Sequence, residues 1–352
     1  MINIEYKKHI LRFNFPAKTS RGAMDVKPTY FIKLTDTENP EWFGVGECSM
    51  LPGLSIDDDV NYEIYLASFC QSLMHLQDIK SIDELHDISN FPSIKFGLEM
   101  AVRDFQRNKN KKLFSNGFAE GEIRIPINGL VWMGNKNFML EQVKTKIEKG
   151  FDCIKIKVGA INFDEELEVI KSIRDTFSSD EITIRLDANG AFKPGSDAQE
   201  KLLRLSEFEI HSIEQPIMAK QWEEMAALCA QTPIPIALDE ELIGVMPDHR
   251  NQLLDMIKPQ HIILKPSLIG GFTDAKDWIE KAESKDIGWW VTSALESNIG
   301  LNAICQFTAN YDIKMPQGLG TGQLYHNNID SPLTIENGEI YYDNNKDWGK
   351  VF

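Results

Sequence analysis

Lysines and acids stand at the ends of several short apolar runs in the second half of the sequence, and their types suggest chemistry at one shared site. The runs are rich in β-branched residues and alternate with amphipathic stretches, which predicts strands alternating with helices. The ionisable side chains at the run ends are Lys155, Lys157, Asp187, Glu214, Asp239 and Lys265. Because the carboxyl ends of parallel barrel strands surround one mouth, we expect these six side chains to converge.

Three of these side chains are carboxylates, those of Asp187, Glu214 and Asp239. A single acid after a strand is equally well explained as the N-cap of the next helix. Three acids directed into one mouth of low dielectric would repel one another unless a cation neutralised them or their pKa values rose. Oxygen ligands favour Mg2+ or Mn2+ over zinc, which more often recruits His or Cys. The sequence therefore predicts a Mg2+ site, with Mn2+ as the alternative ion.

The lysines flank the acids along the chain. Lys155 and Lys157 are two residues apart, so both side chains point to one face of a strand, here the barrel interior. Lys265 follows an apolar run that should stand across the barrel from this pair. A buried lysine near other cations has a lowered pKa and can act as a general base near neutral pH. Such lysines beside a metal suit removal of a proton from a carbon next to a carboxylate.

A barrel would position these groups. The predicted strands are residues 123–130, 153–158, 182–186, 209–213, 234–238, 261–264 and 289–292, and the predicted helices include 138–149, 164–177, 222–229, 273–282 and 299–309. Neither a G-x-G-x-x-G nor a Walker sequence stands at a strand-to-helix turn, which disfavours a nucleotide-binding sheet. The predicted fold class is α/β, a modified TIM barrel of the (β/α)7β type with an α+β capping domain.

The predicted domains are an N-terminal α+β capping domain of residues 1–118, a catalytic barrel of residues 119–322, and a tail, 323–352, that returns to the capping domain. The first domain opens with strand-like alternation at residues 5–13 and 30–34. The tail contains a predicted hairpin at 332–342 around Asn337-Gly338. Residues 18–23 and 51–55 are predicted lid loops, with a plain surface loop or turn as the alternative for each.

Composition narrows the class of protein. The 352 residues carry a formal charge of -16, which argues against nucleic acid as a partner. The five cysteines are scattered and lack a Cys-x-x-Cys pair, which fits a reducing compartment. His211 and His261 stand at strand beginnings, so we interpret both as structural, and an amidohydrolase-type site is disfavoured. Without a long apolar stretch, we expect a soluble cytoplasmic protein that acts on a small carboxylate, has no membrane partner, and is of undetermined oligomeric state.

The strand-end motifs resemble those of the enolase superfamily, in particular its muconate cycloisomerase-like branch, over essentially the whole chain. The matching segments are Lys155-Ile156-Lys157, Asp187-Ala188-Asn189-Gly190, Glu214-Gln215-Pro216, Asp239-Glu240 and Lys265-Pro266-Ser267. This resemblance implies that the three acids bind Mg2+ and that Asn189 supports the site. It also implies that Lys157 removes the α-proton, Lys155 tunes Lys157 and helps to hold the substrate carboxylate, and Lys265 stabilises an enediolate from the opposite side.

Within that branch, residues 46–53, 293–302 and 317–322 resemble the o-succinylbenzoate synthases. The resemblance implies loss of water from 2-succinyl-6-hydroxy-2,4-cyclohexadiene-1-carboxylate, a step of menaquinone biosynthesis. Ser293 would contact the substrate. Where dipeptide epimerases of the branch usually carry Asp-x-Asp, this chain has Gly318 and Gly320, whose backbone N–H groups suit an anionic succinyl tail. Arg185 matches an arginine of some synthases, and a structural barrel ion pair is an equal alternative.

Two other functions stay open at this point. Opposed lysines also permit proton removal on one face and return on the other, as in an N-succinylamino acid racemase or another racemase or epimerase of the superfamily. The charged ring could also stabilise a barrel that has no catalytic function. Removal of the metal separates this last case, because a structural metal lowers the melting temperature when it is chelated, whereas a catalytic metal mainly supports turnover.

Overall fold

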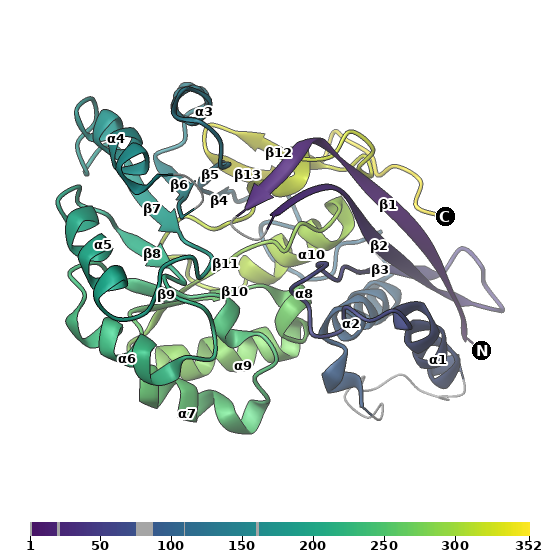
Figure 1. The fold of residues 1–352 in the computed structure, drawn as a ribbon. Helices are drawn as coiled ribbons and strands as arrows, with labels where there is room; N and C mark the ends of the chain where they lie inside the picture. Colours follow the sequence, from purple (N-terminus) through teal and green to yellow (C-terminus); the bar gives the residue numbers. More distant parts are fainter. Residues whose placement is uncertain (1, 20–21, 75–86, 109, 160–161) are drawn as a thin grey trace.

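The computed structural model describes residues 2–19, 22–74, 87–108, 110–159 and 162–352. Figure 1 shows a curled parallel sheet and the helices around it, in teal to green, on one side of the molecule. Long antiparallel strands and two helices, in purple to blue, lie on the other side. Among the helices in the described ranges, none is long and apolar enough to cross a membrane.

A seven-stranded parallel sheet forms the centre of the larger part, and its strands follow one another in chain order. They are β5 (Gly129–Val131), β6 (Cys153–Lys157), β7 (Thr183–Asp187), β8 (Ser212–Glu214), β9 (Ile236–Leu238), β10 (His261–Leu264) and β11 (Gly288–Val291). Every residue of β6, β8 and β9 is buried, as expected for a parallel sheet that is covered on both faces. The predicted strands agree with the observed strands in order and place. Most of the predicted strand ends lie within three residues of the observed ends.

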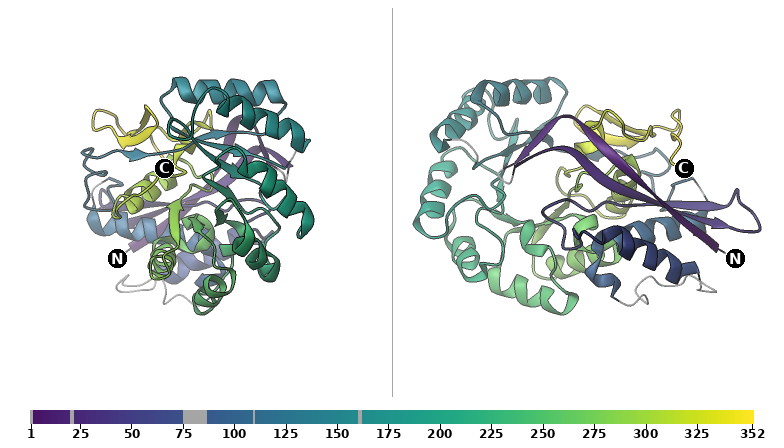
Figure 2. Two further views of the ribbon diagram at one scale, coloured as in Figure 1. Left: turned by 90° about the vertical axis from the view of Figure 1, so that its left-hand side faces the viewer. Right: turned by 45° about the vertical axis from the view of Figure 1, so that its right-hand side comes forward.

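Helices cover the outside of this sheet, as both views in Figure 2 show. They are α3 (Lys136–Glu148), α4 (Phe163–Arg174), α5 (Ser196–Ser206), α6 (Trp222–Gln231), α7 (Pro247–Ile257), α8 (Pro266–Ile269), α9 (Gly271–Glu283) and α10 (Asn298–Thr308). On α5 the buried residues Ala198, Leu202 and Leu205 lie on one face at helical spacing. Helices α5 and α7 are not among the predicted helices, because polar side chains separate their few apolar positions.

Residues 316–318 connect the two edge strands of the sheet. Gln317 forms a parallel bridge with Ile127, and Gly318 forms one with Thr292. The N–H of Gly318 donates to the carbonyl of Val291 over 2.8 Å, and the N–H of Gln317 donates to that of Pro126 over 2.8 Å. The sheet therefore has backbone hydrogen bonds at both of its edges.

The smaller part is a three-stranded antiparallel sheet with two helices. It contains β1 (Ile2–Thr19), β2 (Gly22–Asp36), β3 (Phe43–Cys48), α1 (Tyr62–Met74), the 3-10 turn η1 (Ile88–Asn90) and α2 (Pro92–Arg107). The predicted loop at 18–23 is partly strand, because β1 extends to Thr19 and β2 begins at Gly22; residues 20–21 lie outside the described ranges. Helix α2 packs so closely on β3 that a Cβ on Gly46 would lie 1.9 Å from the Gly97 carbonyl oxygen.

The C-terminal segment contacts both parts. Strands β12 (Leu333–Glu336) and β13 (Glu339–Tyr342) form the predicted hairpin, with positive φ at Asn337 and Gly338. This hairpin pairs with β4 (Ile125–Pro126), just before the parallel sheet. Before the hairpin, a short 3-10 turn, η3 (Gly320–Gln323), leads to Tyr325, which bridges Phe13 of β1.

Candidate active site

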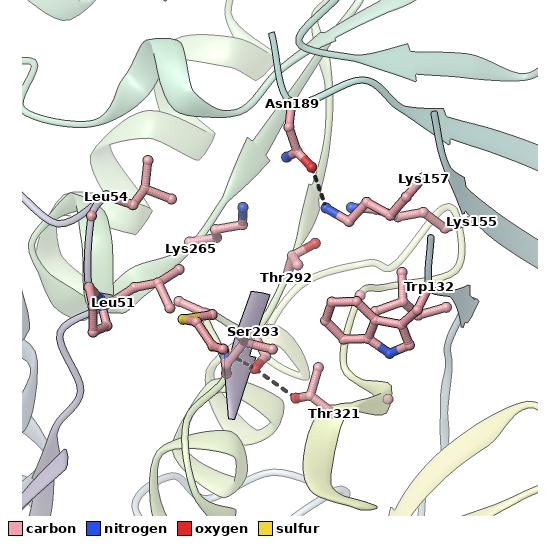
Figure 3. A pocket seen from close by; sticks show the side chains of 18 of the residues that line it. Leu51, Leu54, Trp132, Lys155, Lys157, Asn189, Lys265, Thr292, Ser293 and Thr321 are labelled. Carbon is pink, nitrogen blue, oxygen red and sulfur yellow. Dashed lines mark hydrogen bonds between the residues drawn. The ribbon is translucent and has the colours of Figure 1, made fainter. Parts of the chain in front are cut away.

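A cavity of about 260 Å3 lies at the carboxyl ends of the parallel strands, between the two parts of the molecule. Its apolar wall includes Met24, Leu51, Leu54, Leu130, Trp132 and Leu295, and its polar lining includes Lys155, Lys157, Lys265, Asn189, Ser293 and Thr321. Figure 3 shows Lys155 and Lys157 on one side and Lys265 on the other. The residues that line the cavity include three lysines and no acid, so the cavity suits an anionic ligand.

The acids lie beside the lysines and bind their ammonium groups. Lys155 Nζ lies 2.5 Å from Glu214 Oε2 and 2.9 Å from Asp187 Oδ2. Lys157 Nζ donates to Asp187 Oδ2 over 2.5 Å, and Lys265 Nζ donates to Asp239 Oδ2. The strand register aligns Lys157 with Asp187 and Asp187 with Glu214, which explains why the groups meet. The structure therefore brings together the six side chains that the sequence predicted to converge.

The pKa values of the lysines differ although the groups are neighbours. Burial lowers the pKa of Lys157, and the ammonium groups of Lys155 and Lys265 act in the same direction against the attraction of Asp187. Burial also lowers the pKa of Lys155, but the carboxylates of Asp187 and Glu214 outweigh it, and the net pKa is raised. Lys157 is therefore the member of the pair that gives up a proton more readily.

The carboxyl groups are similarly divided. Burial raises the pKa of Glu214 to about 8, in spite of the hydrogen bond from Lys155. Burial also raises the pKa of Asp239. For Asp187 the cost of burial is outweighed by Lys155 and Lys157, so its pKa is lowered. Burial thus raises the pKa values of Glu214 and Asp239 although Lys155 and Lys265 bind these groups.

A divalent metal ion needs several oxygen ligands within one small volume. Within the described ranges, no group of three or more His, Cys, Asp or Glu side chains is close enough together to hold a metal ion. The carboxylates turn toward the lysine ammonium groups instead. Glu214 Oε1, however, is buried and has no hydrogen-bond partner among the described residues. This spare oxygen and the all-oxygen donor set fit a hard divalent cation.

The residues predicted to contact the substrate differ in how well they can reach a ligand in the cavity. Asn189, Ser293, Gly318 and Gly320 line the cavity. Asn189 Oδ1 accepts from Lys157 Nζ over 2.8 Å. The N–H of Gly318 is used by the carbonyl of Val291, so it is not available for a substrate tail. Gly318 instead provides space, because a Cβ there would lie 2.3 Å from Thr292 Oγ1.

Arg185 does not line the cavity but lies deeper inside the sheet. Its Nη1 donates to the Pro316 carbonyl over 2.7 Å, and its guanidinium stacks on Trp290 with 4.2 Å between the carbon and the ring centroid. His211 and His261 stack near the same ring, at the beginning of their strands. These contacts with described residues indicate that Arg185 supports the interior of the parallel sheet and does not contact the substrate.

Several lining residues were not predicted from the sequence. Asn128 and Trp132 flank Leu130 at a spacing of two, which is the signal for one strand face, but the predicted strand ended at residue 130. Thr292 ends the predicted strand 289–292 and Thr321 lies in the segment 317–322, but neither side chain was singled out. Leu51 and Leu54 do line the cavity, as do Gly22 and Ala23 from the other predicted lid segment; residues 20 and 21 of that segment lie outside the described ranges.

The fold and this arrangement of lysines and acids define an enolase-type protein. A family model described as "Enolase C-terminal domain-like" matches residues 139–346, more than half of the chain. A solved dipeptide epimerase from Enterococcus faecalis, complexed with Mg and a dipeptide, has a TM-score of 0.83 at 20% identity and covers 97% of this chain, with 96% of its own length matched. At this identity the likeness concerns the fold alone.

Much stronger similarity defines the subgroup. An o-succinylbenzoate synthase from Desulfotalea psychrophila is 46% identical over 96% of this chain and 98% of its own length. The crystal structure of MenC from the same organism has a TM-score of 0.85 at 42% identity, over 97% of this chain and 99% of that one. An N-succinyl-L-Arg/Lys racemase from Bacillus cereus is 25% identical over 82% of this chain and 78% of its own length. The chain belongs to the o-succinylbenzoate synthase family of the enolase superfamily.

Proposed function

We propose that the protein is an o-succinylbenzoate synthase, a carbon-oxygen lyase of menaquinone biosynthesis. It removes water from 2-succinyl-6-hydroxy-2,4-cyclohexadiene-1-carboxylate and yields o-succinylbenzoate. The observation that carries this proposal is the convergence of three lysine ammonium groups on one cavity, with three carboxylates directly beside them. The full-length similarity to an o-succinylbenzoate synthase supports the choice of substrate.

Lys157 is the base. Its lowered pKa favours the neutral amine that accepts the proton from the carbon next to the substrate carboxylate. The resulting ammonium returns this proton to the departing hydroxyl group, which leaves as water while the ring becomes aromatic. Lys265 stands on the opposite side of the cavity and retains its charge, since Asp239 and Glu240 raise its pKa although burial lowers it. It stabilises the negative charge that develops on the carboxylate.

Asp187, Glu214 and Asp239 would hold Mg2+, with Mn2+ as the alternative. When bound, the ion would supply charge stabilisation for the substrate carboxylate as it becomes an enediolate. The spare oxygen of Glu214 and the raised pKa values of Glu214 and Asp239 support this assignment, because burial opposes the charge of both groups although a lysine binds each of them. Lys155 binds Asp187 and Glu214 and adds positive potential at Lys157, which lowers the pKa of Lys157 further than burial alone does.

The chain architecture follows the same division. We infer a (β/α)7β barrel, residues 119–322, in which residues 316–318 serve as the eighth strand through their bonds to both edge strands. Residues 1–118 form the capping domain, and residues 323–352 return to it through the bridge from Tyr325 to Phe13. The cap contributes Met24, Leu51 and Leu54 to the cavity, which excludes water from the reacting groups.

A direct absorbance assay for the aromatic product tests the function. The purified protein should form o-succinylbenzoate with Mg2+ and lose this activity after treatment with a chelator, with recovery on readdition of metal. Lys157→Ala should reduce the rate by at least about 1,000-fold, since it removes the group that transfers the proton. Exposed Lys144 provides a matched control, and Lys144→Ala should retain the wild-type rate. Full activity of Lys157→Ala would contradict the proposed base.

A second activity, racemisation of N-succinylamino acids, is favoured by one specific observation: Lys157 and Lys265 face each other across the cavity (Figure 3). In a racemase, Lys265→Ala should stop solvent proton exchange at the α-carbon of one enantiomer only. In a dehydratase, both lysine variants should stop dehydration. Exchange measured by NMR in D2O on each enantiomer separates the two activities.

A further inference from the structure

One wall of the cavity is a single face of β5 and its flanking residues. Asn128, Leu130 and Trp132 alternate along the chain and all line the cavity. The residues between them, Gly129 and Val131, are buried on the other face. A strand presents every second side chain to the same side, so this wall runs from the floor of the cavity outward. It offers an amide, an alkyl group and an indole in that order.

Most polar groups on the side of the cavity away from the acids already have partners. The hydroxyl of Thr321 donates to Ser293 Oγ over 2.7 Å, and the hydroxyl of Ser293 donates to Glu296 Oε2 over 2.6 Å. The N–H groups of Ala294 and Leu295 donate to Glu296 and Ser293. The N–H of Gly318 is also used. These groups therefore have no proton left to donate to an anionic ligand.

Among the described residues that line the cavity, the exceptions are Asn128 Oδ1 and Thr292 Oγ1, which are buried without a partner, and Trp132. Its indole N–H has no acceptor among the residues that the structure describes, although a buried Trp usually finds one. The side chain is 5% exposed and packs against Leu11, Phe13, Ala17 and Tyr325. Gln142 fixes its backbone, because it accepts from the Trp132 N–H over 2.9 Å and donates to the Trp132 carbonyl over 3.0 Å. The indole N–H is therefore a fixed hydrogen-bond donor that is available to a ligand.

The direction of the Trp132 indole N–H suits a second anionic group of the ligand. Figure 3 shows the indole on the same side of the cavity as Lys155 and Lys157, with its nitrogen on the edge away from the two ammonium groups. A ligand whose first carboxylate lies near the acids and lysines would bring only a distant group to this edge. The alkyl side chain of Leu130, which precedes Trp132 on the same face, suits a short methylene chain.

We propose that Trp132 determines specificity for the succinyl tail by donating its indole N–H to the terminal carboxylate of that tail, while Leu130 contacts the two methylene groups. This proposal rests on the proposed function and deepens it, since it assigns the recognition of the tail to residues of the first barrel strand. Neither Gly318 nor Ser293 performs it, because their donors are already in use.

The test is the variant Trp132→Phe, which removes the N–H and keeps an aromatic ring. Isothermal titration with o-succinylbenzoate should show affinity about tenfold or more weaker than for the wild type, the usual effect of one lost hydrogen bond to a charged group. With 2-acetylbenzoate, which lacks the terminal carboxylate, the two proteins should bind equally. Trp42→Phe is the matched control, because Trp42 donates to the Phe105 carbonyl at the surface of the cap. It should leave both affinities unchanged.

Two results would overturn the proposal: equal affinity of Trp132→Phe and wild type for o-succinylbenzoate, or an equal loss with both ligands. NMR of the wild-type protein gives a second readout that does not depend on the variant folding. The indole N–H resonance of Trp132 should move downfield on addition of o-succinylbenzoate and stay in place with 2-acetylbenzoate. Wild-type turnover is measured separately, so absence of dehydration would reject the proposed function and not this subsite alone.

Discussion

Asp187 contacts two ammonium groups at once, and this crowding shows how much charge the site holds in a small volume. Glu214 is the complementary case. It accepts from Lys155 through one oxygen and keeps the other without a partner in the described chain. A buried carboxylate in that condition costs stability unless a cation binds it. The residue that should respond most to metal is therefore Glu214.

Replacement of Glu214 by Gln tests this. The neutral amide keeps the size of the side chain but removes one negative charge from the donor set, so affinity for Mg2+ or Mn2+ should fall on the order of tenfold or more. Titration calorimetry with the metal alone measures this without any substrate. Exposed Glu223 gives the control, and Glu223→Gln should bind metal as the wild type does. Unchanged affinity in Glu214→Gln would remove this residue from the ligand set.

At the residue scale the sequence predicted the lysines and acids because each stands at the end of a β-branched run. Such placement needs only strand periodicity and the geometry of parallel strands. It could not predict that the hydroxyl of Ser293 is committed to Glu296, or that the N–H of Gly318 is committed to Val291. Those facts depend on contacts between segments far apart in the chain, which no local pattern contains.

Among the helices, three have N-termini that are satisfied by carboxylates from distant segments. Asp57 accepts from the Ser93 N–H at the beginning of α2 over 2.9 Å. Glu99 on α2 accepts from the Phe272 and Thr273 N–H groups at the beginning of α9. Glu47 on β3 accepts from the Gly300 N–H of α10 over 2.8 Å. Two of these contacts join the N-terminal part to helices that cover the parallel sheet, so helix capping also fixes the position of the N-terminal part.

Glu47→Ala should therefore be strongly destabilising. Glu47 is fully buried and also accepts from Thr29 Oγ1 and from both the N–H and the hydroxyl of Ser297. Its removal leaves several buried donors unpaired, and we expect a loss of roughly 3 kcal/mol or more in the free energy of unfolding. Chemical denaturation measures this. Glu200→Ala, at an exposed position of α5, is the control and should change the free energy of unfolding by no more than about 0.5 kcal/mol. An equally small change for Glu47→Ala would contradict the prediction.

The helices and strands differed in how well the sequence indicated them. The hairpin β12–β13 was predicted because Asn337-Gly338 is a strong local turn signal. Strands β1 and β2 are longer than predicted. Their outer ends pair with each other beyond a register shift between Arg12 and Ala17, and these ends have no apolar alternation that would have indicated strands. Long-range pairing overrides local preference there.

For the whole molecule, pH should change stability through Asp57. Burial raises the pKa of Asp57 from 3.8 to about 6, although Ser93 donates two hydrogen bonds to it. A raised carboxyl pKa means that the folded state binds the proton more tightly, so this contribution is complete below about pH 4 and is lost as the pH rises through 6. Unfolding free energy measured from pH 4.5 to 7.5 should fall more steeply for the wild type than for Asp57→Asn. Parallel pH profiles of the two proteins would contradict it.

The architecture of the whole molecule was predictable as βα alternation, and the order of the strands agrees with that prediction. The closing segment was harder to predict. Residues 316–318 contain a proline and a glycine and have no β-branched run, yet they bond to both edge strands. Only the geometry of the curled sheet gives such a short segment its place, and this geometry is a property of the assembled strands.

The bridge between Phe13 and Tyr325 has a consequence for biosynthesis. The neighbouring bond from Asn14 to Gln323 spans 309 residues, so the ribosome must add all of these residues before β1 acquires this partner. Until then Leu11 and Phe13, which are buried in the folded protein, remain exposed to solvent on the nascent hairpin. Contacts of such high separation form late and leave apolar surface open to aggregation. We expect the newborn chain to be a client of molecular chaperones.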